Sequence, residues 1–507
     1  MARTMFNIHL LTSIFDLCVL SFTFSDAKNV VLMFGDDAGI QLGAYNNPVC
    51  KTPHLDNLAS RGVTFKYGYT SVSSCSPSRS ALLTGLPQHQ NGIYGLASGQ
   101  FHFSSFDNVI SLPKILSKNQ IRTGIIGKYH VQPESVYTFD FMQTDATHDG
   151  NSIGRNITLM NEYFEQFIST NDSRPFFLYM AFHDTHRCNV PDVYGEFCEK
   201  FGDPSKSNGT IPDWIPDYYD PMNVALETYI PDNSIARQDL ANLYTVTGRL
   251  DQGVGLFMRT LEKYNLLDDT LIIYTSDNGI PFPGAKTNLY DHGMIEPFIV
   301  SSPDSKQNWG KTSNALASTT DIVPTILDWF DVQYPNWTLF KTQVKLTGQS
   351  LLPALSNVDA TGFDHVFASH NLHEVTMYYP MRVIRTKDIR LIHNLNYFAP
   401  YPMALDIFDS PTFRKLLNDT QTGQPTEWIK SLKDYYYRSE FEMFNVTSDP
   451  NELVNLAYNP KYFSIFSDLK ARLNAWQNET NDIWRCEPRG VLVTDGTCVS
   501  ADNIFDN

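Results

Sequence analysis

The chain has 507 residues, of which 42% are hydrophobic and 13% aromatic, and its formal net charge is −17 at pH 7. This length supports a large core and more than one domain, and the aromatic content excludes an intrinsically disordered protein. The acidic balance argues against a general nucleic-acid binder, which needs a basic face, but a local basic pocket could still bind an anion.

Residues 1–25 are typical of a secretory signal peptide. Arg3 precedes a mostly apolar run, which Asp16 interrupts, and Thr23 and Ser25 are small enough for a cleavage site. No later apolar run reaches the length of a membrane span. We therefore expect a protein of the secretory route without a membrane span.

Sequons and cysteines agree with that route. Seven Asn-x-Ser/Thr sequons are candidate glycosylation sites: Asn156, Asn171, Asn208, Asn336, Asn418, Asn445 and Asn478. Two pairs of cysteines lie close in sequence and predict two local disulfides in an oxidising compartment: Cys188 with Cys198, and Cys486 with Cys498. Beyond the signal segment this leaves Cys50 and Cys75, either as free thiols or as a pair with each other.

Four short apolar runs predict strands that are buried on both faces of a mostly parallel sheet. They cover residues 29–35, 123–127, 175–182 and 270–275, and helical patterns lie between them. Each run turns polar at its carboxyl end, where open α/β sheets bind their ligands. We therefore expect these strand ends to gather one set of side chains at one edge: Asp36, Asp37, Lys128, His130, His186, Asp277 and Asn278.

The character of the chain changes after about residue 360. Short runs at 379–385 and 389–393 suggest antiparallel strands, and residues 462–476 have a helical pattern. We predict a catalytic domain over residues 26–360 and a smaller α+β domain over residues 361–507.

The stretch Ser71–Gly85 places Cys75 two residues before Pro77, which favours the first turn of a helix, while Gly85 suits its end. Backbone N–H groups at a helix start favour an anion, and Arg79 adds positive charge within one turn. The residues alone fit a reactive group beside an anionic substrate. They fit equally well an inert Cys in a Ser-rich loop.

Two polar pairs at strand ends indicate a metal site. Asp36, Asp37, Asp277 and Asn278 offer oxygen ligands alone, which hard cations prefer, and Ca²⁺ is the expected ion in a secretory compartment. Zinc is disfavoured because no His or Cys belongs to the set. Taken singly, each pair is more typical of an ordinary turn, but two such pairs at the ends of two buried strands favour a metal site.

The run Cys75-Ser-Pro-Ser-Arg79, followed by Leu82-Leu-Thr-Gly85, resembles the signature of the type I sulfatases. Asp36-Asp-Ala-Gly39 and Ser276-Asp-Asn-Gly279 are similar to that family's metal motifs. The resemblance implies an alkaline-phosphatase-like fold, with a large, mostly parallel sheet flanked by helices and a smaller C-terminal domain built on an antiparallel sheet. It also implies that a formylglycine-generating enzyme oxidises Cys75 to formylglycine, whose hydrate is the nucleophile.

The resemblance further implies roles for the remaining site residues. The four oxygen ligands and residue 75 would bind calcium. Arg79 and Lys128 would hold the hydrate, and His130 would hydrogen-bond to it. His186 and Lys286 would bind the sulfate, with His186 as the candidate general acid. Lys286 is separated from Asn278 by a loop whose course the sequence does not define.

Four further segments resemble one group of sulfatases within this family. They are residues 127–130, 186–188, 280–283 and 373–382. The resemblance implies removal of the N-linked sulfate from N-sulfated glucosamine at the non-reducing end of heparan sulfate, in the lysosome, by a homodimer. His373 and Glu374 could meet the sugar or amine, or could belong to the second domain's core. The alternatives are an O-sulfatase, a phosphoryl-transfer enzyme of the same fold, which usually has Ser or Thr with zinc, and an inactive glycan-binding protein.

Overall fold

The computed structural model describes residues 28–147, 153–188, 193–205, 210–494 and 496–500. The predicted signal peptide over residues 1–25 and the sequon at Asn208 lie outside them. Within the described residues, no helix is long and apolar enough to cross a membrane.

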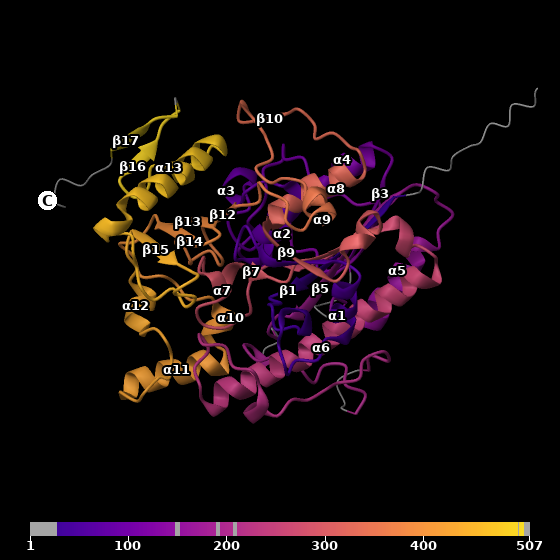
Figure 1. The fold of residues 1–507 in the computed structure, drawn as a ribbon, viewed down its shortest axis with the longest axis horizontal. Helices are drawn as coiled ribbons and strands as arrows, with labels where there is room; N and C mark the ends of the chain where they lie inside the picture. The colour runs from indigo at the N-terminus through magenta and orange to yellow at the C-terminus, as the bar shows by residue number, and fades with distance from the viewer. Residues whose placement is uncertain (1–27, 148–152, 189–192, 206–209, 495, 501–507) are drawn as a thin grey trace, which may run out of the picture.

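A nine-stranded, mostly parallel sheet forms the centre of the molecule (Figure 1). Its strand order is β4-β3-β5-β1-β6-β8-β2-β7, with β9 paired to β2. The strands are β1 (Asn29–Asp36), β2 (Val63–Tyr69), β3 (Arg122–Gly127), β4 (Phe141–Thr144), β5 (Phe176–Thr185), β6 (Thr270–Ser276), β7 (Ile295–Glu296), β8 (Ile299–Ser301) and β9 (Lys311–Ser318).

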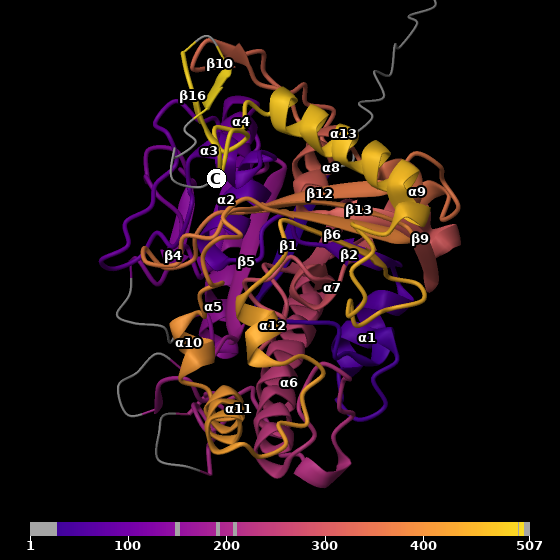
Figure 2. The ribbon, with the colours of Figure 1, turned by 90° about the vertical axis from the view of Figure 1, so that its left-hand side faces the viewer.

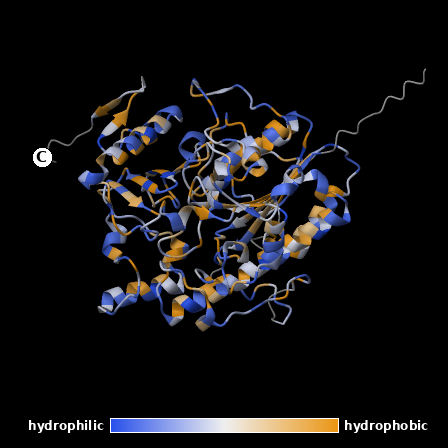
Figure 3. Cartoon of the chain, viewed as in Figure 1, coloured by the Kyte–Doolittle hydropathy of each residue, from blue (hydrophilic) through white to orange (hydrophobic). Residues whose placement is uncertain are grey.

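The four strands predicted from the apolar runs are direct neighbours. β3, β5, β1 and β6 pair in that order and all run parallel, so their carboxyl ends meet at one edge. Side chains of β1 alternate between the faces of the sheet, as strand geometry requires. Val30 and Leu32 pack into one hydrophobic cluster and Val31 and Met33 into another. The prediction of a buried parallel sheet is therefore confirmed, and orange, hydrophobic segments gather in the central strands in Figure 3.

Helices cover both faces of this sheet (Figure 2). One face carries α1 (Pro53–Ser60), α5 (Ile157–Ile168) and α6 (Ser234–Lys263), and the other α2 (Cys75–Thr84), α4 (Leu112–Lys118), α8 (Ile322–Trp329) and α9 (Leu352–Ser356). Shorter elements are α3 (Gln88–Asn91) and α7 (Asp291–Met294) and the hairpin β10 (Thr338–Leu339) with β11 (Thr342–Gln343).

A four-stranded antiparallel sheet follows in the order β12-β13-β14-β15. It comprises β12 (His365–His370), β13 (Met381–Thr386), β14 (Ile389–Asn394) and β15 (Phe441–Asn445), and α13 (Phe463–Glu479) packs along it (Figure 2). Also in this part are α10 (Leu405–Phe408), α11 (Pro411–Thr422), α12 (Leu432–Tyr436) and the hairpin β16 (Gly490–Leu492) with β17 (Cys498–Ser500). The two sheets share one hydrophobic cluster, which joins Tyr69 and Leu316 to Val366 and Val383. The domain boundary near residue 360 stays a prediction.

The cysteines pair as Cys188–Cys198 and Cys486–Cys498. Cys50 and Cys75 are both free and buried, so the alternative of a bond between them is wrong. Among the sequons that the structure describes, four asparagines are exposed and two are half-buried. The exposed ones are Asn171, Asn336, Asn418 and Asn478, and the half-buried ones are Asn156 and Asn445. Their glycosylation stays a prediction.

Gly85 ends α2 in the left-handed conformation, with φ of 70°. A Cβ there would lie 2.5 Å from Leu346 Cδ2 and 3.1 Å from Val323 Cβ. We expect Gly85→Ala to lower the free energy of unfolding by about 1–2 kcal/mol, because it adds a packing conflict to the backbone cost. Chemical denaturation measures this change.

Gly423 is the matched control, because it ends α11 with φ of 68° and a Cβ added there would meet no atom within 4 Å. Gly423→Ala should therefore show the backbone cost alone. Equal losses in the two variants would contradict a packing role for Gly85.

His89, in α3, contacts three side chains of the C-terminal part of the chain. Its Nδ1 lies 3.2 Å from Ser369 Oγ, its Nε2 lies 2.7 Å from Thr480 Oγ1, and its ring stands edge-on to Trp476. Burial, helped by the charge of Arg382, lowers the pKa of His89 to about 3. The folded state therefore holds a neutral imidazole where the unfolded chain takes up a proton near its ordinary pKa.

This histidine should make the fold acid-sensitive. Above the unfolded pKa of about 6.5, His89 is neutral in both states and the protein keeps its full stability. Below that pH, protonation of His89 in the unfolded chain lowers the free energy of unfolding by about 1.4 kcal/mol per pH unit, until the folded pKa is reached. We expect His89→Gln to flatten the pH dependence of the free energy of unfolding between about pH 6.5 and 4. Urea titrations at several pH values test this. An unchanged slope would contradict the assignment.

Candidate functional site

The predicted acidic pairs meet at the carboxyl ends of β1 and β6. The backbone N–H of Asp37 donates to Asp277 Oδ1 at 2.8 Å, and Asn278 Nδ2 donates to Asp37 Oδ1 at 2.7 Å. One ligand atom each from Asp36, Cys75 and Asp277 lie within 4.8 Å of one another. Asp36, Asp37, Asp277 and Asn278 are all fully buried. The structure thus brings Asp36 and Asp277 beside residue 75, and hydrogen bonds join Asp37 and Asn278 to this cluster.

This cluster fits a hard cation. Its donors are carboxylate and amide oxygens, and the buried Oδ1 of Asn278 has no hydrogen-bond partner. Burial, together with the negative charge of Asp36, raises the pKa of Asp277 well above its ordinary value. Burial alone would raise the pKa of Asp36. The positive charges of Lys128, His186 and Arg79 outweigh this effect and hold that pKa well below the usual range. Crowded buried carboxylates of this kind are stabilised by a bound cation.

Calcium should therefore stabilise the folded protein. At a free concentration about 100 times the dissociation constant, the expected gain is about 2.7 kcal/mol, seen as a rise in Tm after Ca²⁺ is added to chelator-treated protein. Asn278→Leu should shrink that rise, since it removes the unpartnered amide oxygen. An equal rise in this variant would contradict the assignment of Asn278 as a ligand.

Cys75 is the first residue of α2 and is 1% exposed. Burial raises the pKa of its thiol well above the ordinary value, against the opposing charges of Lys128 and Lys286. Because the thiolate is the reactive form of cysteine, an unmodified Cys75 is a poor nucleophile at this place. The position suits a nucleophile, but the thiol itself does not.

Three cations surround this position. Arg79 donates to Asp277 Oδ2 at 2.9 Å and to Asp36 Oδ1 at 3.2 Å, and Tyr179 OH lies 3.1 Å from its other amino group. Lys128 Nζ lies 2.5 Å from Asp36 Oδ2. Lys286, whose place the sequence left open, donates to Asp37 Oδ2 at 2.8 Å. Positive charge therefore surrounds the acidic cluster, as binding of an anion requires.

Two histidines complete the predicted set. His130 has a positive φ of 46°, and its Nε2 shares a hydrogen bond of 2.9 Å with Ser98 Oγ. The buried Nδ1 of His130 has no hydrogen-bond partner. His186 Nδ1 donates to the carbonyl oxygen of Arg187 at 2.7 Å. This contact fixes the tautomer and leaves Nε2 of His186 as the atom that can gain or lose a proton.

His186 Nε2 lies 3.9 Å from Asp37 Oδ2 and 3.8 Å from Asp406 Oδ2. Burial and the charge of Lys286 lower the pKa of His186, so the imidazolium expected from the ordinary value at acidic pH is disfavoured in this arrangement. A bound anion would act in the opposite direction, because negative charge favours the protonated ring.

The structure places His373 and Glu374 differently. His373 is 3% exposed, and its Nδ1 lies 2.8 Å from Ser74 Oγ, beside residue 75. Glu374 is half-buried, and its Oε1 accepts the backbone N–H of Leu405 at 2.9 Å. His373 thus supports the loop before α2, while Glu374 lies toward α10. Contact of either one with substrate stays a prediction.

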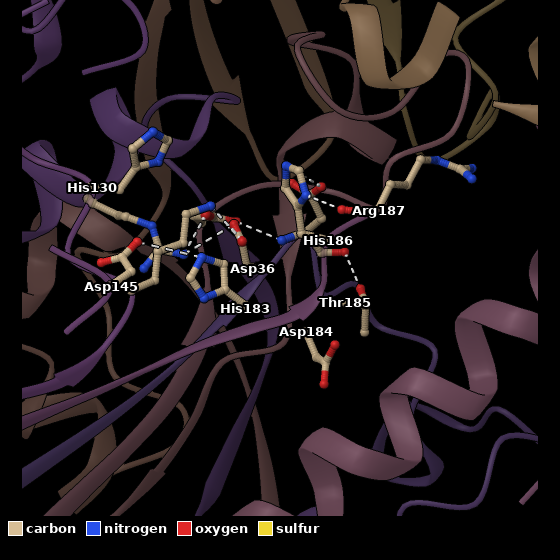
Figure 4. A network of polar contacts seen from close by, with 12 residues as sticks. Asp36, His130, Asp145, His183, Asp184, Thr185, His186 and Arg187 are labelled. Atoms are coloured by element: carbon tan, nitrogen blue, oxygen red, sulfur yellow. Dashed lines mark hydrogen bonds and ion pairs between the residues drawn. The ribbon is translucent and has the colours of Figure 1, made fainter. Parts of the chain in front are cut away.

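Figure 4 shows the end of β5, where successive side chains point to different sides. His183 faces Asp145, with Nε2 at 3.6 Å from Asp145 Oδ2. Asp184 points away from both and is bonded by Arg155 and by Arg249, whose Nε lies 2.6 Å from Oδ2. These contacts hold both side chains within the fold and give His183 and Asp184 structural roles.

Sequence reasoning did not find Asp406, Tyr179 or Asp145. Tyr179 lies on β5 at a position whose inward orientation the strand period would have given. Asp406 comes from the short helix α10, and nothing in its local sequence marks it. Its Oδ2 accepts from Lys286 Nζ at 2.6 Å, so a residue of the C-terminal part reaches the site.

Comparison with known proteins agrees with this geometry. A profile of the sulfatase family matches residues 28–332. Human N-sulphoglucosamine sulphohydrolase is 50% identical over 478 residues, covering 94% of this chain and 95% of the relative. An ulvan-active sulfatase of Formosa agariphila is 25% identical over 483 residues, covering 90% of this chain and 76% of the relative.

A solved structure described as a complex with its substrate D-glucosamine-2-N,6-O-disulfate has a similar fold. Its TM-score is 0.61 at 21% identity, over 90% of this chain and 98% of the other. Family resemblance, fold and strand-end geometry agree, and the chain belongs to the sulfatase family.

Proposed function

We propose that this protein hydrolyses the N-linked sulfate of N-sulfoglucosamine at the non-reducing end of heparan sulfate-type glycans. The identity of 50% with human N-sulphoglucosamine sulphohydrolase, over nearly the full length of both chains, carries the substrate class. The ring of cations around residue 75 supports an anionic group there. An O-sulfatase is the alternative, because other relatives bear such names, among them an N-acetylglucosamine-6-O-sulfatase of Bacteroides thetaiotaomicron.

The proposed cofactors follow the family. Asp36, Asp37, Asp277 and Asn278, which hydrogen bonds and short distances link, would hold calcium. The ion would supply positive charge to offset that of a sulfate oxygen. Formylglycine, made from Cys75 by a formylglycine-generating enzyme, would supply the nucleophile as its hydrate. Arg79 and Lys128 are placed to hold the side chain at position 75, because both contact the carboxylates beside it.

The remaining residues would manage charge and protons. Lys286 and His186 bind the sulfate oxygens and offset their negative charge. When the S–N bond breaks, the nitrogen keeps the electron pair and takes a proton, because an amide anion is a very poor leaving group. His186 Nε2 is the atom that can deliver this proton. His130, through its unpartnered Nδ1, can accept a proton when sulfate is later expelled.

The cellular setting is part of the proposal. A signal segment, exposed sequons and two disulfides support passage through the secretory route to the lysosome. A homodimer is also proposed, and exposed apolar side chains around the start of α13, such as Tyr458 and Phe463, offer surface for a partner copy. Equilibrium sedimentation of the glycosylated protein tests this oligomeric state.

A substrate comparison tests the function. Protein made in a secretory host is assayed for sulfate release from N-sulfoglucosamine and from 6-O-sulfated glucosamine, and the free amine is measured alongside the sulfate. We expect amine and sulfate in equal amounts from the N-sulfated sugar and little release from the O-sulfated one. Preference for the O-sulfated sugar would overturn the proposal in favour of an O-sulfatase.

A further inference from the structure

Asp406 is an acidic group beside two residues of the proposed sulfate site. Its side chain is buried, and its Oδ2 lies 2.6 Å from Lys286 Nζ and 3.8 Å from His186 Nε2. These two cations are the ones that the proposed function assigns to the sulfate. A carboxylate beside them repels sulfate oxygens, so its presence calls for a positive or hydrogen-bond-donating partner in the substrate.

The position of Asp406 indicates which part of the substrate it meets. Lys286 Nζ contacts both Asp37 Oδ2, in the metal cluster, and Asp406 Oδ2, and one ligand atom each from Asp37, His186 and Asp406 lies within 4.8 Å of the others. His186 Nε2 is the atom proposed to protonate the leaving nitrogen, and Asp406 Oδ2 lies 3.8 Å from it. Asp406 is therefore close to the place where that nitrogen has to lie.

Asp406 also has free hydrogen-bonding capacity. An ionised carboxylate offers about four acceptor positions. In the structure Oδ2 accepts from Lys286, and Oδ1 accepts the backbone N–H of Ile407 at 2.9 Å. Glu374 lies nearby, because it accepts the N–H of Leu405 at the start of the same helix.

The geometry points to Asp406 as the residue that selects N-sulfate over O-sulfate, by accepting the N–H of the substrate sulfamate and then the ammonium group of the released amino sugar. This inference rests on the proposed function. The bridging nitrogen of a sulfamate carries one hydrogen, whereas the bridging oxygen of a sulfate ester carries none and presents lone pairs. A buried acceptor left without its donor rejects such an analogue.

Ligand binding by the wild-type protein gives the first test. Calorimetry at acidic pH compares glucosamine, whose amine is then protonated, with glucose, which has a hydroxyl in its place. We expect glucosamine to bind about tenfold more tightly or better. Equal affinities would overturn the inference, whatever any variant does.

Asp406→Asn gives the second test. It should remove the preference for glucosamine over glucose and lower kcat/KM for N-sulfoglucosamine by about 10- to 100-fold, because a charged acceptor is lost. Affinity for inorganic sulfate should stay the same or rise, since a repulsive charge is gone. If Asp406 only holds Lys286 and His186 in place, sulfate affinity falls and the sugar preference is unchanged, which would overturn the inference.

Asp409→Asn is the matched control. Asp409 is at the end of the same helix, and its carboxylate bonds Arg414 but contacts neither Lys286 nor His186. This variant should leave both preferences unchanged. Asp406→Glu retains the charge and should keep part of the glucosamine preference if the Asn variant does not fold. A wrong proposed function would give a different result, because the wild-type protein would then release no sulfate from N-sulfoglucosamine.

Discussion

Replacing Cys75 with Ala should abolish sulfate release, with a loss of about 10⁴-fold or more in kcat, because the nucleophile is removed. Cys75→Ser should lose activity to a similar degree. A serine could be sulfated once, but it lacks the second hydroxyl of an aldehyde hydrate that would expel the sulfate. Kinetics on N-sulfoglucosamine measure both losses.

Cys50 provides the control, because it is the other free, buried cysteine of the described residues. Cys50→Ala should keep kcat within a few-fold of wild type, since Cys50 packs in a hydrophobic cluster to which none of the proposed site residues belongs. Mass spectrometry of the peptide that carries residue 75 should find the aldehyde in protein from a secretory host. A thiol in every molecule, with full activity, would contradict the formylglycine mechanism.

Asp184→Asn should lower the free energy of unfolding by about 3–5 kcal/mol, because it leaves two buried guanidinium groups without their counter-charge. Arg155 and Arg249 both bond this carboxylate, and Asp184 and Arg249 are fully buried. Arg155 also donates to the carbonyl oxygen of His186 at 2.9 Å, so the loss should loosen the backbone that carries this histidine. Urea denaturation gives the free energy.

Asp172 is the matched control for this prediction. It pairs with Arg174 at 2.7 Å near the surface, where ion pairs contribute only about 0–1 kcal/mol. Asp172→Asn should therefore change stability little. Similar small losses in both variants would show that the buried Asp184 network does not stabilise the fold as its geometry indicates.

The parts of the fold that were predictable are those with a strong hydrophobic signal. β1, β3, β5 and β6 are wholly buried, and their apolar runs mark them in the sequence. The strands that extend the sheet have no such signal. β9 (Lys311–Ser318) is polar over its first half and is a strand because it pairs with β2, a tertiary contact between distant residues.

The site divides in the same way. Residues that directly follow a predicted strand, such as Asp36, Asp277 and Lys128, could be placed together because neighbouring parallel strands end at one edge. Lys286 and Asp406 reach the site from a loop and from a helix after the second sheet begins, and their meeting at 2.6 Å depends on how these parts pack. Only the packed structure brings that contact into view.

The burial of Cys75 has a consequence for the order of events during synthesis. Cys75 is 1% exposed, and Ser74 next to it is held by His373 from the second part of the chain. The proposed conversion of this residue to formylglycine would need an enzyme to reach it before the fold closes. On that proposal, we expect a chain that folds with an unmodified Cys75 to stay inactive.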